Sequence, residues 1–174
     1  MILIKEKLNK ILNRKNLTIY QLSKLTNFSE SALGLMIKGK CPFLDKAMKK
    51  ILSVLEISQE EFESWVIADK YPKEVLKLAL EAKKNFPYKR KSVLTANIDS
   101  ILQQKGMSRT AAAKQIDYSQ SGLNRMIIGQ ISMSKTVIER LSKVLDISET
   151  EIKSWIVADK YSKKVLELSI KECL

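Results

Sequence analysis

The sequence predicts an all-α protein made of two similar helical domains. Apolar residues recur at helical rather than alternating spacing, and the 174 residues include only five glycines and three prolines. The chain also repeats itself: residues 4–84 align without a gap with residues 94–174, and 25 of those 81 pairs are identical. We call these the first and second segments. The repeat predicts domains over residues 1–84 and 94–174, joined by a basic linker over residues 85–93.

Each segment is expected to hold five or six helices, which we take in order. The first helix ends near Asn16 in one segment and near Gly106 in the other. Thr18 and Gln21 fit a capping box that opens the second helix, whereas Ser108 caps its counterpart without a reciprocal Gln. The apolar residues that define the first helix are Leu8, Ile11 and Leu12.

The third helix of each segment has a start and a stop signal. Ser29 and Ser119 are expected to cap its beginning, because a serine oxygen accepts the unpaired N–H groups there. Gly39 and Gly129 are expected to end it, since glycine accepts the left-handed conformation at little cost. A fourth helix is then predicted over residues 44–55.

The fifth and sixth helices close each segment. Ser58 with Glu61, and Ser148 with Glu151, fit capping boxes that open the fifth helix. The sixth is expected to begin at a residue that commonly starts helices, and to bear an aliphatic stripe. The two starting residues are Pro72 and Ser162, and the stripes are Val75, Leu76 and Leu78 and, in the second segment, Val165, Leu166 and Leu168.

The second and third expected helices share features that suit a close helix crossing. Ser23 and Ala113 are small, and Asn27 and Asp117, at the turn, are the non-glycine residues that best tolerate a positive φ. The stretches LTIYQLSKLTNFSESALGLMIKGK and MSRTAAAKQIDYSQSGLNRMIIGQ resemble the Xre, or lambda-repressor-like (Cro/CI-type), helix-turn-helix family. The likeness, with the flanking helices, covers residues 4–65 and 94–155, and Leu22, Leu33 and Met36 are expected in the core.

The chain departs from the family at one pair of positions. The family often pairs an Arg on the first helix with a Glu near the end of the recognition helix, whereas this chain has Leu12 with Ile37 and Leu102 with Ile127. Both partners are replaced together in both segments. Exchanging a buried ion pair for two apolar residues is often neutral or stabilising, so the fold is expected to survive.

The resemblance implies which residues read bases. The start of the third helix enters the major groove of double-stranded DNA in this family, and residues just inside it reach base edges. Gln and Asn can form two bonds to adenine, and Arg can form two to guanine. The second segment is therefore the better reader. The candidate base-reading residues are Gln120, Ser121, Asn124 and Arg125 there, and Glu30, Ser31, Gly34 and Leu35 in the first segment.

Positive charge accompanies the helix-turn-helix half of each segment. The formal net charge is +12; residues 1–55 carry 11 basic and 3 acidic side chains, and residues 56–84 carry 5 and 7. Residues 94–145 carry 7 and 3, and residues 146–174 carry 5 and 6. Such clustering favours phosphate binding over the alternative, a merely solvated surface. The phosphate candidates are Thr18, Lys15, Lys24, Lys38, Lys40, Ser108, Arg109, Lys105 and Lys114.

The stretch SWVIADKY recurs as SWIVADKY ninety positions later, and ten of the fifteen residues from Ser64 to Leu78 match their partners. Two copies that touch through one patch about a local two-fold axis would require this, so we expect an internal pseudo-dimer. Two alternatives are slow divergence of a domain core, and pairing of the patches between chains as further homodimerisation. The candidate interface residues are Trp65, Asp69, Tyr71, Leu76, Trp155, Asp159, Tyr161 and Leu166.

These features predict a sequence-specific transcriptional regulator, a repressor of phage or plasmid type by the resemblance, with an asymmetric operator. One alternative is a protein-binding module, an antitoxin or an inhibitor of a nucleic-acid enzyme, whose features would be Leu35, Cys41, Phe43 and Leu44; another is sequence-tolerant architectural binding. The linker cations Lys89, Arg90 and Lys91 either lie along phosphates or keep a tether soluble.

The composition also predicts several absences. The chain has no His, no glycine-rich phosphate loop and no paired acids in a recognisable setting, so no enzymatic activity, cofactor or metal is expected. Cys41 and Cys173 lack metal-ligand spacing and are expected to be reduced thiols. No stretch approaches eighteen uninterrupted apolar residues, and the start MILIKEKLNK lacks a signal-peptide core, so a cytoplasmic protein without membrane contact is expected.

Overall fold

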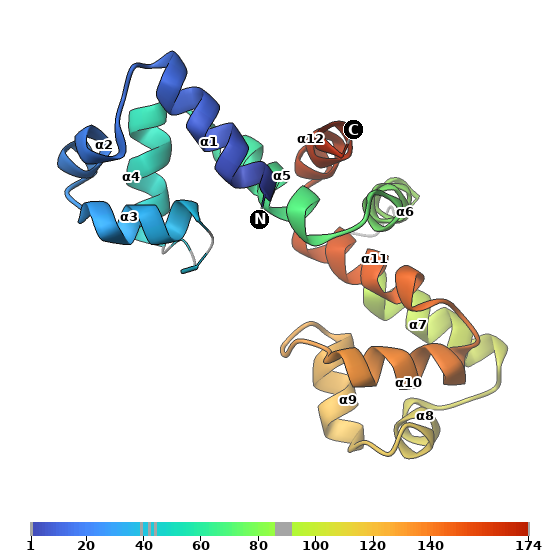
Figure 1. Cartoon of the computed structure of the whole chain (residues 1–174). Coiled ribbons are helices and arrows are strands. Elements are labelled where there is room, and N and C mark those ends of the chain that lie inside the picture. The colour runs from blue at the N-terminus through green and yellow to red at the C-terminus, as the bar shows by residue number, and fades with distance from the viewer. Residues whose placement is uncertain (1, 39, 42, 44, 86–91, 174) are drawn as a thin grey trace. The chain divides into compact units, whose positions relative to one another are not determined.

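The computed structural model describes residues 2–38, 40, 41, 43, 45–85 and 92–173, and this part of the chain is helical with no strand (Figure 1). The predicted all-α class is confirmed over these residues. Gly39, Leu44 and the linker cations Lys89, Arg90 and Lys91 lie outside them. The helices are α1 (Ile2–Arg14), α2 (Ile19–Thr26), α3 (Glu30–Ile37), α4 (Asp45–Leu55), α5 (Gln59–Lys70), α6 (Lys73–Lys84), α7 (Val93–Gln104), α8 (Arg109–Gln115), α9 (Gln120–Ile127), α10 (Lys135–Leu145), α11 (Glu149–Lys160) and α12 (Lys163–Glu172).

Helices of the two segments combine into two compact units that differ from the two segments. Unit 1 comprises Met1–Pro72 together with Glu167–Leu174, and unit 2 comprises Lys73–Leu166. The last helix of the first segment, α6, therefore belongs to the unit that contains α7–α11, and the end of α12 belongs to the unit that contains α1–α5. A sequence repeat identifies similar stretches of chain, but it does not say against which neighbour each helix packs.

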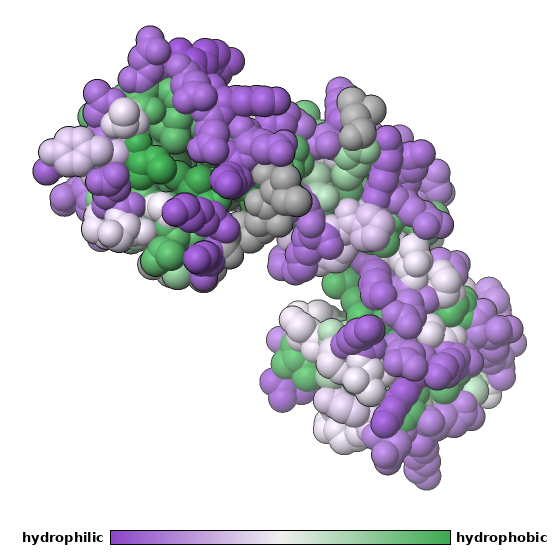
Figure 2. All heavy atoms as spheres, in the orientation of Figure 1, coloured by the Kyte–Doolittle hydropathy of each residue, from purple (hydrophilic) through white to green (hydrophobic). Residues whose placement is uncertain are grey.

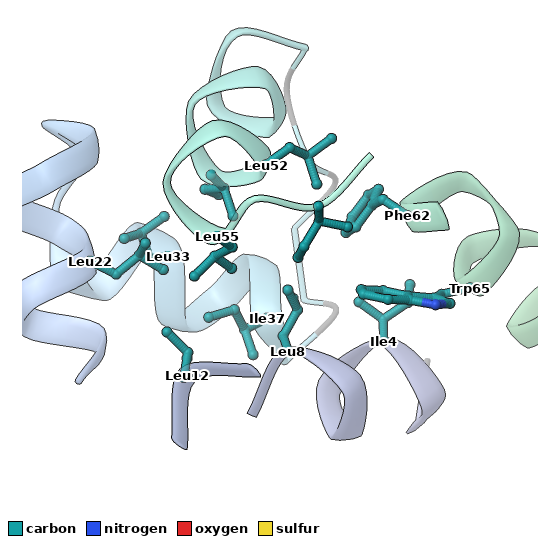
Figure 3. Packing of buried hydrophobic residues seen from close by; sticks show 12 residues of the cluster. Ile4, Leu8, Leu12, Leu22, Leu33, Ile37, Leu52, Leu55, Phe62 and Trp65 are labelled. Carbon is teal, nitrogen blue, oxygen red and sulfur yellow. The ribbon is translucent and has the colours of Figure 1, made fainter. Parts of the chain in front are cut away.

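The core of unit 1 gathers one apolar stripe from each of its first five helices. Leu22, Leu33, Ile37, Leu52 and Leu55 belong to one buried cluster, in which Figure 3 shows Ile37 near α1 and Leu52 on the side away from α1. At the other end of the cluster, Phe62 stands edge-on to two aromatic neighbours, with ring centroids 5.1 Å from Phe43 and 6.1 Å from Trp65. The α1 side chains that complete this cluster are Ile4, Leu8 and Leu12.

The predicted helix starts are confirmed by their hydrogen bonds. Thr18 accepts the Gln21 N–H at 3.1 Å while its own N–H donates to Gln21 Oε1 at 2.8 Å, which is the complete capping box. Ser108 accepts the Ala111 N–H at 3.1 Å without a reciprocal partner, as its sequence predicted. Ser29, Ser58 and Ser119 accept the backbone N–H three residues on, and Ser148 forms a full box with Glu151. The box predicted at Ser58 forms only in part, because Ser58 accepts the Glu61 N–H without the reciprocal bond from its own N–H to Glu61.

The turn chemistry is confirmed as well. Asn27 and Asp117 have φ of +57° and +52°, in the left-handed region that these residues tolerate best. Gly129 has φ of +78° after α9, where its N–H donates to Met126 O and the following N–H of Gln130 donates to Arg125 O. This pair of bonds is a Schellman motif, which satisfies the last carbonyls of the helix that the resemblance identifies as the reader.

The apolar pair that replaces the family's ion pair is buried in both segments. Leu12 and Ile37 are each 4% exposed, and Leu102 and Ile127 are 3% and 0% exposed. Helix α1 contacts α3, and α7 contacts α9, so each pair joins the same two helices. The prediction that apolar residues can take these positions is confirmed.

In unit 2, helix α6 contacts α11, and Val75, Leu76 and Ala79 of α6 are buried. Lys83 adds a polar contact, since its ammonium donates to the carbonyl oxygen of Ala158 at 2.6 Å. In unit 1, Lys7 of α1 forms an ion pair with Glu172 near the end of the chain. No described helix combines the length and apolar character needed to cross a membrane.

Candidate nucleic-acid interface

Helix α9 separates its inward and outward residues cleanly. Leu123, Met126 and Ile127 are buried, which fixes one face of the helix on the unit. The four candidate base-reading residues lie on other faces: Gln120, Ser121 and Arg125 are exposed and Asn124 is half-buried. Two polar or charged side chains able to pair with bases thus stand in the first turn, and two more stand one turn later.

A glycine shapes the first turn of α9. A Cβ atom added at Gly122 would lie 2.6 Å from Cε1 of Tyr118 and 2.7 Å from Ser119 Oγ. Glycine therefore lets the Tyr118 ring lie against the helix start beside the capping serine. The corresponding residues of the first segment are Ala32 and Phe28.

Helix α3 presents a less polar set at the same positions. Glu30 and Ser31 are exposed, Gly34 is half-buried and Leu35 is 41% exposed. Each of these could reach a groove, but only Glu30 and Ser31 offer hydrogen-bonding groups. The structure therefore agrees with the sequence in giving the second segment the richer set of base-reading side chains.

The candidate phosphate contacts divide into two groups. Lys15 and Arg109 are held by acids of their own unit: Lys15 pairs with Glu56 at 2.9 Å, and Arg109 pairs with Asp99 at 2.7 Å. The hydrogen bond from Lys15, with its positive charge, lowers the pKa of Glu56. Those two cations are less available to phosphate than the sequence suggested. The remaining candidates are exposed: Thr18, Lys24, Lys38, Lys40, Ser108, Lys105 and Lys114.

Asp99 of α7 contacts the candidate site, which the sequence did not reveal. Its two carboxylate oxygens accept from Arg109 Nε at 2.8 Å and Arg109 Nη2 at 2.9 Å. Arg109 Nη1 also donates to Asn124 Oδ1 at 3.3 Å. A chain of contacts therefore runs from α7 through the first residue of α8 to a candidate base reader on α9. Asp99 and Arg109 are ten positions apart and lie on different helices, so helical periodicity in the sequence gives no signal for their contact.

The recurrence of the aspartate in the repeated octapeptide has a local explanation in both copies. Asp69 accepts the backbone N–H groups of Leu3 and Ile4, at 3.0 and 3.2 Å. Ninety residues later, Asp159 accepts those of Val93 and Leu94, at 2.7 and 3.0 Å. A carboxylate at a helix N-terminus satisfies otherwise unpaired donors and opposes the positive end of the helix dipole.

The lysine and tyrosine of the octapeptide also have local roles. The Lys70 ammonium lies 5.3 Å from the ring centroid of Tyr71, and Lys160 lies 5.6 Å from that of Tyr161. Tyr71 and Tyr161 follow the last residues of α5 and α11, where their N–H groups donate to Ile67 O and Val157 O. The recurrence of these residues therefore does not by itself require a contact between the two copies. The apolar candidates for the interface are buried: Trp65, Leu76, Trp155 and Leu166.

A further pair of cations recurs at the end of the second helix. Lys50 of α4 donates to Thr26 O at 3.1 Å, and Arg140 of α10 donates to Ile116 O at 2.8 Å. A cation at a helix C-terminus is favourable for the helix dipole and satisfies an unpaired carbonyl. Part of the positive charge of residues 1–55 and 94–145 therefore stabilises the fold.

Large apolar side chains are exposed in both segments: three on α2 and α3, and, in the second segment, Tyr118 and Ile128, which are 40% and 49% exposed. Tyr20, Leu25 and Leu35 are 55%, 60% and 41% exposed, and hydrophobic residues show among hydrophilic ones on the visible face of unit 1 (Figure 2). The residues at the matching positions of the second segment are Thr110, Gln115 and Arg125. Of the apolar residues expected to mark a protein-binding surface, Leu35 and Cys41 are exposed, whereas Phe43 packs on Phe62.

Comparison with known proteins supports the helix-turn-helix assignment for the second segment. Residues 98–152, which extend from α7 into α11 and contain all of α8 and α9, match the family model described as Helix-turn-helix. No curated protein and no solved structure matched the chain. The part of the molecule that holds Asp99, Arg109 and the candidate base readers of α9 thus resembles DNA-binding regulators of the helix-turn-helix family.

Proposed function

We propose that this chain is a sequence-specific regulator of transcription that binds double-stranded DNA, acts as a repressor, and reads bases chiefly through α9. It needs no cofactor and catalyses no reaction. Helix α3 and the exposed lysines of the first segment add contacts with phosphate. The observation that carries the proposal is the outward set on α9, Gln120, Ser121 and Arg125, on a helix whose opposite face is buried within a matched helix-turn-helix region.

The direct test is selection of bound fragments from random double-stranded DNA with the full chain. We expect enrichment of one motif, whose affinity falls in Gln120→Ala and Arg125→Ala at individual base positions. One good pair between a side chain and a base provides about 1–3 kcal/mol of discrimination against the wrong base. Each variant should therefore lose roughly fivefold or more of its preference at the base that it reads. Loss of affinity that is equal for all sequences, with no enriched motif, would contradict base reading and indicate phosphate binding alone.

We also propose that the two segments are tandem helix-turn-helix domains, residues 1–84 and 94–174, arranged as an internal pseudo-dimer that exchanges its last helices. The make-up of the compact units supports this. Helix α6 packs on α11, and residues from Glu167 onward belong to the unit of α1–α5. Recurrence of equivalent hydrogen bonds ninety residues apart, at Asp69 and Asp159, supports a common domain.

This arrangement makes a definite prediction about the operator. A pseudo-dimer with two unlike readers should bind as a single chain to a site with two different halves, spaced by about one DNA turn, 34–36 Å. Light scattering of the protein–DNA complex gives the number of chains, and footprinting gives the symmetry of the site. Two chains bound to a palindrome would contradict the proposal and favour pairing of patches between chains.

A second candidate function is favoured by the apolar surface of the first helix-turn-helix. Exposed Tyr20, Leu25 and Leu35 suit a protein partner better than a phosphate backbone, as in an antitoxin or an inhibitor of a nucleic-acid enzyme. Leu25→Glu and Leu35→Glu distinguish the two functions. If this surface of α2 and α3 only contacts DNA, the added negative charge weakens DNA binding in a salt-dependent manner. If the surface binds a protein, DNA affinity changes little, and a protein that co-purifies with the wild-type chain no longer co-purifies with the variants.

A further inference from the structure

We infer that Asp99 and Arg109 fix the side-chain amide of Asn124 in one orientation and thereby set which bases the second helix-turn-helix accepts at that position. The inference rests on the proposed function of α9 as a base reader. It assigns Asp99 as a positioning residue, which acts on DNA only through two other side chains. It also gives Arg109 a role other than phosphate contact.

The strongest link in this chain is between Asp99 and Arg109. Both carboxylate oxygens are used, with bonds of 2.8 and 2.9 Å to two nitrogens of one guanidinium. Paired bonds between planar groups fix the plane as well as the position of the arginine. The side chains of Arg109 and Asp99 are 27% and 33% exposed, so water does not surround the pair fully. The guanidinium is therefore held by α7 before any DNA arrives.

The hydrogen bond from Arg109 fixes the orientation of the Asn124 side-chain amide. Arginine has only donors, so the atom of Asn124 that lies 3.3 Å from Arg109 Nη1 must be the carbonyl oxygen, Oδ1. Covalent geometry then turns the amide nitrogen away from the guanidinium. An asparagine with a free amide can flip and present either atom, whereas in Asn124 one lone pair of Oδ1 accepts from Arg109 and the two N–H donors are turned away from the guanidinium.

The consequence for base recognition follows from the groups that bases present in the major groove. Guanine offers two acceptors there, O6 and N7, and thymine offers O4. Adenine presents one acceptor, N7, beside its amino donor, and cytosine presents only an amino donor, so a fixed amide that offers N–H groups meets a facing donor in both bases and makes fewer hydrogen bonds to adenine than to guanine. We therefore expect guanine or thymine at the base next to Asn124, whereas a free asparagine typically reads adenine.

The first segment offers a matched comparison because it lacks all three residues. Asn9, Ile19 and Gly34 stand where the second segment has Asp99, Arg109 and Asn124. Helices α2 and α3 therefore cannot form the same chain of contacts. The three residues occur together only in the second segment, whose α9 carries the richer set of base-reading side chains.

The test measures ratios of affinity rather than affinities. The motif selected by the wild-type chain is varied one base at a time, and Asn124→Ala identifies the position at which base discrimination disappears. At that position we expect the wild type to prefer guanine or thymine over adenine by about fivefold or more, the lower end of what one base contact provides. In Arg109→Ala and Asp99→Ala the guanine-to-adenine ratio should fall by about fivefold, because the amide is free to flip.

Two further variants complete the experiment. Asp99→Asn keeps the shape but removes the charge, so it should give an intermediate ratio, and Asn9→Ala should leave the ratio unchanged. A ratio of two affinities from one preparation is independent of the folded fraction, so partial unfolding of a variant does not disguise the result. A wild-type preference for adenine at this position, or an unchanged ratio in Arg109→Ala and Asp99→Ala, would overturn the inference. Absence of any preferred motif for the wild type would instead contradict the proposed function itself.

Discussion

Replacement of Asp69 by alanine tests whether this residue of the repeated octapeptide serves to cap the start of α1. The substitution removes the carboxylate that accepts the Leu3 and Ile4 N–H groups at 3.0 and 3.2 Å. These are among the first N–H groups of α1, which have no acceptor within the helix. The protection of these amides from hydrogen exchange therefore depends on Asp69, whose side chain joins the end of α5 to the start of α1.

The magnitude can be worked from the two bonds. A hydrogen bond to a charged group contributes about 1.5–3 kcal/mol in folded proteins, and loss of a helix cap costs about 1 kcal/mol and up to about 2. Asp69 is half-buried, so values at the lower end apply. We expect Asp69→Ala to lower the free energy of unfolding of unit 1 by about 2 kcal/mol and Asp69→Asn by about 1 kcal/mol. For a unit of roughly 80 residues, 2 kcal/mol corresponds to a fall in Tm of about 8–16 °C.

The assay is amide hydrogen exchange followed residue by residue by NMR, with thermal unfolding alongside. In Asp69→Ala the Leu3 and Ile4 amides should exchange at least about tenfold faster, since 1.4 kcal/mol corresponds to a factor of ten. Asp159→Ala is the matched control within the same chain: it should release the Val93 and Leu94 amides and leave those of α1 protected. Unchanged exchange of Leu3 and Ile4, with an unchanged Tm, would refute the reasoning.

Three further predictions concern packing and charge. Gly34→Ala should stabilise α3 by up to about 1 kcal/mol, because the added Cβ meets nothing within 4 Å. Gly122→Ala should give no such gain, because its Cβ would lie 2.6 Å from the ring of Tyr118. Thermal unfolding of the two variants compares them. Ile37→Glu should lower the free energy of unfolding by about 3 kcal/mol or more, because it puts an unpaired charge where the side chain is 4% exposed; urea denaturation measures this. The Glu56 carboxyl should titrate below its ordinary pKa of 4.5 and return toward it in Lys15→Met, as NMR titration will report. Because the folded pKa is lowered, the ion pair contributes to stability above that ordinary value and its contribution is lost as pH falls through the folded pKa.

Sequence reasoning predicted features that depend on neighbouring residues. The caps at Thr18 and Ser148, the positive φ at Asn27 and Asp117, and the Schellman ending at Gly129 all follow from chemistry within a few residues. The buried stripes of the helices follow from periodicity in the same way. Such local signals establish that a helix exists, where it ends and which of its faces is buried.

What could not be predicted depends on contacts distant in sequence. The bonds from Asp69 to α1 cross more than sixty residues, and the chain from Asp99 through Arg109 to Asn124 joins three helices. The apolar stripe of α6 shows that one face is buried but does not name α11 as the partner. Charge counting likewise treats every cation alike, although Lys50 is committed to the carbonyl oxygen of Thr26.

The central claim is that α9 reads bases, and selection from random double-stranded DNA tests it most directly. The full chain should enrich one motif without two-fold symmetry, and Gln120→Ala and Arg125→Ala should each relax it at separate positions while the other positions keep their preferences. Enrichment of no motif, with binding that weakens steeply with salt and equally for all sequences in wild type and variants, would contradict the claim.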